Sequence, residues 1–366
     1  MQPAVCHTFY NRGMNQLDIL LPFGLPPADL AKDLLRQCNT PALAMLLARA
    51  KALQSESFDP FSRALPHETW LAGKFLADYT ATSSSPPLAD ALMRQHGLQA
   101  ETGTWFVVQP VHFHIARDHL VLTDPRQLVL PDAESRLLFE AARPLFEEAG
   151  KTLVYGDAAT WFVQADDWSD LHTATPDAAC GHNIDIWMPR GEAELAWRKL
   201  QNEVQMHWHM HEVNAEREAR GARPVNSLWL WGGASMAHGT HAPASAAPYT
   251  DTFRLHGWGL APGASAARNH GDCDAFDIVL ARPRRGLLLL DALQAPALAA
   301  DWGNWLQQLQ ILETNWFVLL LSALQGGRLK HVNLILTHNT GLAEYGVSKA
   351  SLRKFWIKPS LDRLLP

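Results

Sequence analysis

The sequence has 366 residues, 47% of them hydrophobic, and a formal net charge of −6. This length suits one large domain or a core with an inserted subdomain, and the acidic balance excludes a typical basic duplex-binding protein. The four cysteines form no Cys-x-x-Cys pair, which argues against a zinc ribbon or a disulfide framework and for a reducing compartment. We therefore expect a cytoplasmic protein with no nucleic-acid partner.

No segment of the sequence has the pattern of a signal peptide or a membrane span. The N-terminal stretch MQPAVCHTFYNRGMNQ lacks a basic region followed by an apolar run. The apolar run after it, LDILLPFGLPP, is short and contains Asp18 and three prolines. The sequence therefore predicts no association with a membrane.

The first half of the chain predicts a mixture of strands and helices. Residues 105–122 are rich in Val, Phe and Trp and predict strands, and the alternation in VHFHI puts His112 and His114 on one face. We interpret these two histidines as a solvated or hydrogen-bonded strand face. The other expected elements are a buried strand at 17–21, helix at 28–53, a helix starting in 83–90, an amphipathic helix at 132–149, two strands in KTLVYG (151–156) and TWFVQ (160–164), and one long helix at 191–220.

The second half alternates apolar runs with helical segments. FDIVLA (276–281) and GLLLLD (286–291) are continuous apolar runs, as expected of strands buried on both faces. The remaining expected elements are strands at 225–231 and 331–337 and a helix at 299–325. This alternation predicts an α/β core with a mostly parallel sheet.

Three histidines, His207, His209 and His211, stand at alternate positions in QMHWHMHEVN. On a helix His207 and His211 share a face, because they are four residues apart, and His209 points elsewhere. Two histidines at this spacing make a metal motif when a Glu or a third ligand joins them, and no His-Glu-x-x-His pattern is present. We therefore interpret them as structural or surface histidines.

The residues that follow carry a more specific pattern. The run HEVNAEREARGARPVNSLWLWGG, residues 211–233, contains His-x-x-Asn-x-x-Arg-x-x-x-Gly-x-x-Pro-x-Asn and then a strand ending in Trp-Gly. It resembles the archaeal-type cofactor-independent phosphoglycerate mutases of the alkaline phosphatase superfamily. Looser similarity to the same family extends over residues 181–191, 286–317 and 334–340.

The resemblance implies an alkaline phosphatase-like fold, in which helices sandwich a mostly parallel sheet and an α+β subdomain is inserted. On this reading residues 1–94 and 221–366 form the core, and residues 95–220 form the inserted subdomain. The pattern also marks Asn214, Arg217, Asn226 and Trp231 as candidate ligand-binding residues. The residues themselves leave structural roles open: both asparagines can bond backbone, and Arg217 can pair with a carboxylate such as Glu313.

The family catalyses phosphoryl transfer with two divalent ions and a serine nucleophile, and its ligands sit at the carboxyl ends of sheet strands. Here Pro22-Phe23-Gly24 stands where the first strand should carry an aspartate. The family's Asp-Glu-Ala-Gly-His becomes Asp291-Ala-Leu-Gln-Ala295, and its Asp-His becomes Thr337-His338. Ser62 matches the nucleophile only by rough position.

The ligand set is therefore mostly lost, and Asp291 and His338 remain as weak candidates beside Ser62. Two ligands do not hold two ions, so we expect no metal cofactor and no mutase activity. The leading hypothesis is a pseudoenzyme with a binding or regulatory role. Its expected partners are a small anionic or phosphorylated ligand and a protein partner or a second copy of the chain.

The alternative hypothesis is an active mutase or phosphatase with a rebuilt Mn or Zn site. Such a site draws on Asp291, His338, His238, His241 and His270, because the 234–274 loops are rich in His and Asp. It requires these side chains to converge at the carboxyl edge of the sheet. The basic C-terminal segment 349–363 is interpreted as a solvated face.

Overall fold

The computed structural model describes residues 15–76, 79, 83–236, 249, 251–253, 255, 268–269, 276–280 and 285–365. The candidate metal ligands His238, His241 and His270 lie outside these residues. Within the described part of the chain, no helix combines the length and the apolar character needed to cross a bilayer.

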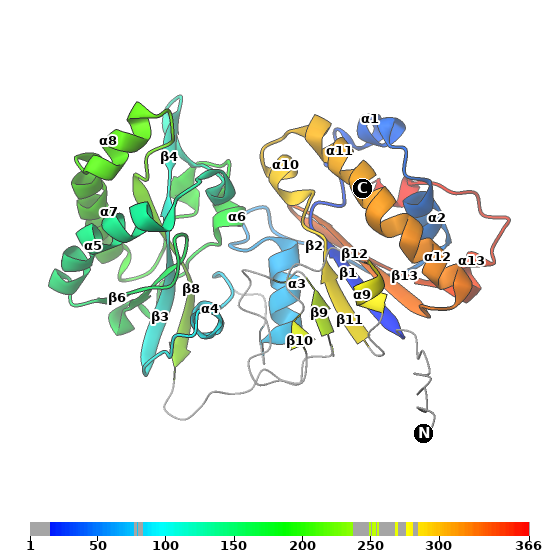
Figure 1. The fold of residues 1–366 in the computed structure, drawn as a ribbon, viewed down its shortest axis with the longest axis horizontal. Helices are drawn as coiled ribbons and strands as arrows, with labels where there is room; N and C mark the ends of the chain where they lie inside the picture. The colour runs from blue at the N-terminus through cyan, green and yellow to red at the C-terminus, as the bar shows by residue number, and fades with distance from the viewer. Residues whose placement is uncertain are drawn as a thin grey trace, which may run out of the picture.

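The central sheet contains seven described strands in the order β10-β9-β11-β1-β12-β13-β2 (Figure 1). Neighbouring strands from β10 to β12 pair in parallel. Strand β13 pairs antiparallel with β12 on one side and with β2 on the other. The prediction of a mostly parallel sheet is thus confirmed. The strands are β1 (Gln16–Leu21), β2 (Lys51–Ser57), β9 (Asp251–Phe253), β10 (Arg268–Asn269), β11 (Arg285–Leu289), β12 (His331–His338) and β13 (Gly341–Ser348).

The central strands β1, β11 and β12 are almost wholly buried, as their continuous apolar runs predicted. Helices pack around the sheet, and α3 contacts β12 and β13 while α2 contacts β13 and α12. The helices of this core are α1 (Ala31–Gln37), α2 (Pro41–Arg49), α3 (Pro66–Phe75), α9 (Phe276–Leu280), α10 (Gln294–Leu298), α11 (Trp302–Leu312), α12 (Val318–Gly326) and α13 (Lys349–Leu352).

A second, antiparallel sheet of four described strands has the order β6-β7-β3-β8. Helices α5 and α7 pack against it and against each other, and a separate hairpin joins β4 and β5. The elements of this unit are β3 (Gly103–Val111), β4 (Phe113–Ala116), β5 (His119–Leu122), β6 (Thr152–Tyr155), β7 (Trp161–Gln164), β8 (Ser227–Met236), α4 (Ala89–Gln95), α5 (Asp132–Glu148), α6 (Pro176–Ala179), α7 (Glu194–His209) and α8 (Glu212–Ala219).

Strand β8 extends the second unit beyond the predicted boundary at residue 220. It pairs with β3 along its whole length, so residues 227–236 belong to the second sheet. Helix α4 also packs on β3 and β8, which places residues 89–95 in this unit. A sequence pattern predicts a strand but not the sheet that it joins, because strand pairing depends on the tertiary structure.

Three sequence predictions are wrong in detail. Residues 276–280 form α9 rather than a strand, because a short apolar run fits a buried helix equally well. The helix expected at 28–53 is two helices, and β2 already begins at Lys51. The helix expected at 191–220 breaks at Met210, and His211 caps the second helix. His207 and His211 therefore do not share the face of one helix.

A side chain far along the chain caps the start of helix α2. The buried carboxylate of Glu313 accepts hydrogen bonds from the backbone N–H of Ala42 (2.6 Å) and of Leu43 (3.1 Å), at the start of α2. Thr40, the N-cap residue, makes no side-chain cap, so Glu313 satisfies donors that a helix start leaves open. Its negative charge also suits the positive end of the helix.

Replacing Glu313 by alanine should therefore destabilise the whole core. Removing the carboxylate loses two charge-assisted hydrogen bonds and leaves their N–H donors buried without an acceptor. This costs about 2 kcal/mol, so the unfolding free energy of E313A should fall by roughly that amount. Urea denaturation measures it, with E203A on the exposed side of α7 as the matched control. Equal stability of E313A and E203A would contradict the role of this cap.

Candidate functional site

The carboxyl end of β1 holds no metal ligand. Phe23 occupies the place of the expected aspartate, buried and in the left-handed backbone region with φ 57°. Its carbonyl accepts a hydrogen bond from the indole of Trp305 (3.0 Å), and its N–H lies 3.4 Å from the hydroxyl of Thr337. The end of β1 is thus filled by an apolar side chain that the core holds in place.

Asp291 and His338, the surviving candidates, do not build a metal centre with a third residue. Among the described residues, the group of three or more metal-ligating side chains found close together includes neither of them. Asp291 is exposed, and His338 is the last residue of β12, where its Nδ1 accepts from the N–H of Thr340 (3.2 Å). The residues at these strand ends therefore do not fit two divalent ions.

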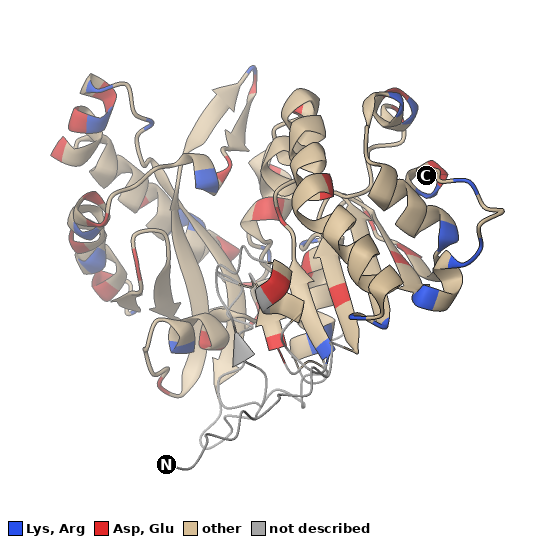
Figure 2. Cartoon of the chain, turned by 45° about the vertical axis from the view of Figure 1, so that its right-hand side comes forward, with Lys and Arg blue, Asp and Glu red and all other residues tan. Residues whose placement is uncertain are grey.

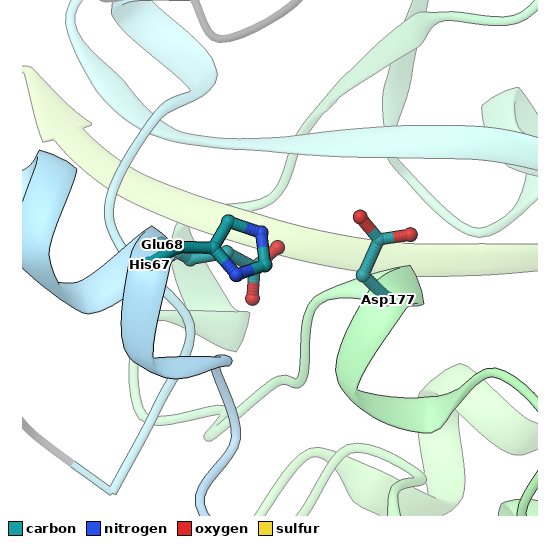
Figure 3. A group of neighbouring side chains, drawn as sticks. All are labelled: His67, Glu68 and Asp177. Atoms are coloured by element: carbon teal, nitrogen blue, oxygen red, sulfur yellow. The ribbon is translucent and has the colours of Figure 1, made fainter. Parts of the chain in front are cut away.

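Three other side chains come together where the two units meet. His67 and Glu68 lie in the first turn of α3, in the core, and Asp177 lies in α6, in the second unit (Figure 3). Each offers one ligand atom, and these atoms lie within 4.8 Å of one another. His67 also packs edge-on against Phe23, with ring centroids 6.1 Å apart. The cluster therefore adjoins the sheet edge where ligands bind in open α/β folds.

Hydrogen bonds hold Glu68 across the junction. Its Oε2 accepts from the hydroxyl of Thr175 (2.6 Å) and from the N–H of Leu65 (2.6 Å). Thr175 caps α6 with the same hydroxyl, which accepts from the N–H of Ala178. One carboxylate therefore fixes the start of α3 and the start of α6 relative to each other.

Arg126 adds the positive charge of the cluster. Its Nη2 and Nη1 donate to the two oxygens of Asp177 (2.8 and 3.1 Å), and its Nε donates to Asp124 (2.8 Å). Gln294 of α10 donates to Asp177 from the core side. The junction thus contains three carboxyl groups and one guanidinium.

Burial dominates the acid–base behaviour of this cluster. Burial, followed by repulsion from Asp177, raises the pKa of Glu68 to about 8 against the opposing hydrogen bonds from Thr175 and Leu65. Burial, followed by the charge of Arg126, lowers the pKa of His67 to about 3. At pH 7 the metal-free cluster therefore holds a neutral glutamic acid and a neutral imidazole.

A pocket of about 630 Å³ opens beside the cluster, between the β4–β5 hairpin and the end of α10. Its polar lining includes His112, His114, His119, Gln127 and Arg223, and Asp124 joins it to the Arg126 pair. Each of the three imidazoles uses Nδ1 within the protein: with the carbonyl of Pro224 (2.8 Å), the hydroxyl of Thr123 (3.1 Å) and the carboxylate of Asp118 (3.0 Å). This leaves Nε2 as the ring atom for a ligand.

The family-like pattern of residues 211–226 supports this pocket from outside, and Arg223 from this stretch is in its lining. Asn226 exchanges two hydrogen bonds with the backbone of Phe113 (2.7 and 2.8 Å), and Pro224 accepts from His112. Asn214, buried, bonds the backbone of Val225 with both ends of its amide (2.8 and 2.9 Å). The two asparagines thus position the hairpin and Arg223 rather than face a ligand.

The other two candidates of the pattern also bond within the protein. Arg217 is buried and pairs with Glu134 (2.6 Å), not with Glu313, and its Nε donates to the carbonyl of Arg223 (2.7 Å). The indole of Trp231 donates to Gln109 (3.1 Å). Ser62 is half-buried, four residues before α3, and its N–H donates to the carbonyl of Asp59.

Sequence reasoning missed His67, Glu68 and Asp177. The signal available was Leu65-Pro66-His67-Glu68, in which Glu68 stands three residues after the N-cap, where a helix-capping carboxylate is common. That position has an ordinary structural explanation, and Asp177 lies 109 residues further along the chain. Only folding shows that the two carboxyls meet.

No protein-family model and no curated protein matches this sequence. Among solved structures, the chain is similar to the PH0037 protein from Pyrococcus horikoshii at 13% identity and a TM-score of 0.49, over 91% of this chain and 87% of that one. It is also similar to the cofactor-independent phosphoglycerate mutase from Thermoplasma acidophilum at 12% identity and a TM-score of 0.41, over 96% and 94%. This second protein belongs to the family that the sequence resembles. Likeness of this degree does not by itself assign an activity.

The raised pKa of Glu68 predicts a pH-dependent stability in metal-free protein. Between the unfolded pKa of about 4.3 and the folded value of about 8, the folded state keeps a proton that the unfolded state releases. Stability is therefore lost as pH rises through this window and levels off above it. The E68Q variant should lack this loss and gain up to about 1.4 kcal/mol per pH unit over the wild type.

Urea unfolding in EDTA at pH 5, 6, 7, 8 and 9 measures the difference. The control is E140Q, an exposed glutamate on α5, which should follow the wild-type curve. Parallel pH curves for the wild type and E68Q would show that Glu68 is ionised in the folded protein at neutral pH.

Proposed function

We propose that this chain is a phosphoglycerate mutase-like protein with an alkaline phosphatase-type core that has lost two-metal phosphotransfer. In this proposal it acts in the cytoplasm as a binding or regulatory protein for a small anionic or phosphorylated ligand. The observation that carries the proposal is the buried Phe23 at the end of β1, where the family resemblance requires a carboxylate ligand. Parts of a two-metal site act as a unit, so losing several removes the reaction rather than slowing it.

The pocket beside the junction supports the choice of ligand. Arg223 supplies a guanidinium, Gln127 an amide and the three histidines ring nitrogens, which together suit phosphate or carboxylate oxygens and neighbouring hydroxyls. Arg223 donates to Gln127 (2.8 Å), and its carbonyl is held by Arg217, so its backbone is fixed before a ligand arrives. Such preorganisation lowers the cost of ordering the site on binding.

The alternative function is a metal-dependent mutase or phosphatase with a rebuilt site. The observation that favours it is the His67, Glu68 and Asp177 cluster, whose residue types match metal ligands. The two functions differ in turnover. An assay with 3-phosphoglycerate and a generic phosphomonoester, each with Mn²⁺, Zn²⁺ or Mg²⁺, should show no turnover above a metal-only blank. Turnover that depends on enzyme and metal would replace the binding proposal with the enzyme.

Ligand binding should depend on Arg223. Calorimetric titration with inorganic phosphate and with 3-phosphoglycerate should show saturable binding to the wild type. A charged hydrogen bond contributes about 1.5–3 kcal/mol, so R223Q should raise the Kd by about 10- to 100-fold. The matched control is R36Q on α1, an exposed arginine paired with Asp33, which should bind as the wild type does. Absence of binding to the wild type, or equal binding by R223Q, would contradict the proposal.

A further inference from the structure

The junction cluster differs from the sites expected at the strand ends. Its members come from the starts of two helices, α3 in the core and α6 in the second unit. His67 and Glu68 are buried, and the side chain of Asp177 is 15% exposed. The site is therefore enclosed but not sealed. In Figure 3 the imidazole and the carboxyl of α3 face the carboxyl of α6.

The ligand atoms have the support that metal sites need. Glu68 spends Oε2 on Thr175 and Leu65, and these bonds leave Oε1 as its ligand atom. Asp177 accepts hydrogen bonds from Arg126 and Gln294. Each carboxylate oxygen has two lone pairs, so Oδ1, which accepts only the bond from Nη2 of Arg126, keeps an acceptor position. Outer hydrogen bonds of this kind orient carboxylate ligands and fix the geometry of the ion that they bind.

The charges of the cluster also do not balance. Glu68, Asp177 and Asp124 can carry three negative charges, and the guanidinium of Arg126 pairs with two of these residues. Uncompensated charge in a buried site is costly. With all three carboxyls ionised the cluster has a net charge of −2, which one divalent cation neutralises; without the cation, a proton on Glu68 removes only one of these charges.

We propose that His67, Glu68 and Asp177 bind one divalent cation of the Zn²⁺ or Mn²⁺ class and that this ion fastens the second unit to the core. One imidazole and two carboxylates suit these ions, and at equal geometry the order of affinities favours Zn²⁺ over Mn²⁺. The ligand atoms lie within 4.8 Å of one another, and a tetrahedral Zn²⁺ draws such atoms to about 3.3 Å. Binding therefore tightens the contact between α3 and α6. None of the three ligands is in the lining of the anion pocket, although Asp124 and Arg126 connect the two sites, so separate variants test the two proposals.

The test uses the full chain stripped with EDTA and dialysed. Isothermal titration with ZnCl₂, MnCl₂ and MgCl₂ gives stoichiometry and affinity, and thermal unfolding gives the shift in Tm. We expect one equivalent of Zn²⁺ per chain, weaker Mn²⁺, little Mg²⁺, and a higher Tm with bound ion. Removal of a direct ligand should cost at least about 100-fold in affinity, since loss of an outer partner already costs 10–100-fold. We therefore expect that loss in each of H67Q, E68Q and D177N.

The E68Q variant guards against a folding artefact, because glutamine reproduces the neutral glutamic acid of the metal-free cluster. The matched control is the double variant H207A/H211A, which removes a histidine pair outside the junction and should bind metal as the wild type does. X-ray absorption of the Zn²⁺ complex should show one imidazole in the first shell. No uptake by the wild type, or uptake that survives in folded E68Q and D177N, would overturn the proposal; so would loss of binding in the H207A/H211A control.

Discussion

The hydrogen bond between Thr175 and Glu68 is the contact on which the arrangement of the two units depends. It joins the first turn of α3 to the cap of α6 at 2.6 Å, and the Arg126–Asp177 pair lies directly behind it. Ion pairs inside a protein gain little net stability, because removing each charge from water is expensive. Such a network instead specifies one arrangement, since displacement would leave the buried Glu68 carboxyl and the largely buried Asp177 without their hydrogen-bond partners. The polar network therefore acts together with apolar packing, because the buried apolar residues of both units belong to one continuous core cluster.

The charged groups nearest the end of β1 come from helix starts rather than from the strand itself. At the edge of an open α/β sheet, the carboxyl ends of the strands normally carry the chemistry. Here Phe23 fills the end of β1, and the charged groups stand on α3, α6 and the turn that contains Arg126. In this part of the edge the polar groups therefore lie on helix starts and not at the end of β1. Helix starts suit carboxylates, because their N–H groups and dipole favour negative charge.

The family-like pattern acquires a mechanical role in this setting. Asn214 and Asn226 each bond backbone groups with both ends of the side-chain amide, and Arg217 donates to the carbonyl of Arg223. The bonds of Asn214 are buried and those of Asn226 and Arg217 are partly buried, so each lost partner would leave a shielded polar group unsatisfied. These bonds hold the β4–β5 hairpin against the start of β8, and the positions of the pocket histidines depend on them. Charged residues of both signs alternate over the helices of this unit (Figure 2), which leaves the pocket's recognition to local groups rather than to a broad field.

The sequence by itself determined the mostly parallel sheet, the strands β1, β11 and β12, the amphipathic α5 and the family resemblance. Each rests on a local signal in the sequence, such as a continuous apolar run or a helical period. Such a signal can be recognised without knowing which segments pack together. It did not determine that residues 276–280 form a helix or that β8 joins the second sheet, because a short apolar run and a strand edge are compatible with several partners. Nor could it show the junction. Glu68 is an ordinary capping residue in sequence, and only the tertiary structure buries it and brings a ligand atom of Asp177 within 4.8 Å of it, which changes its chemistry.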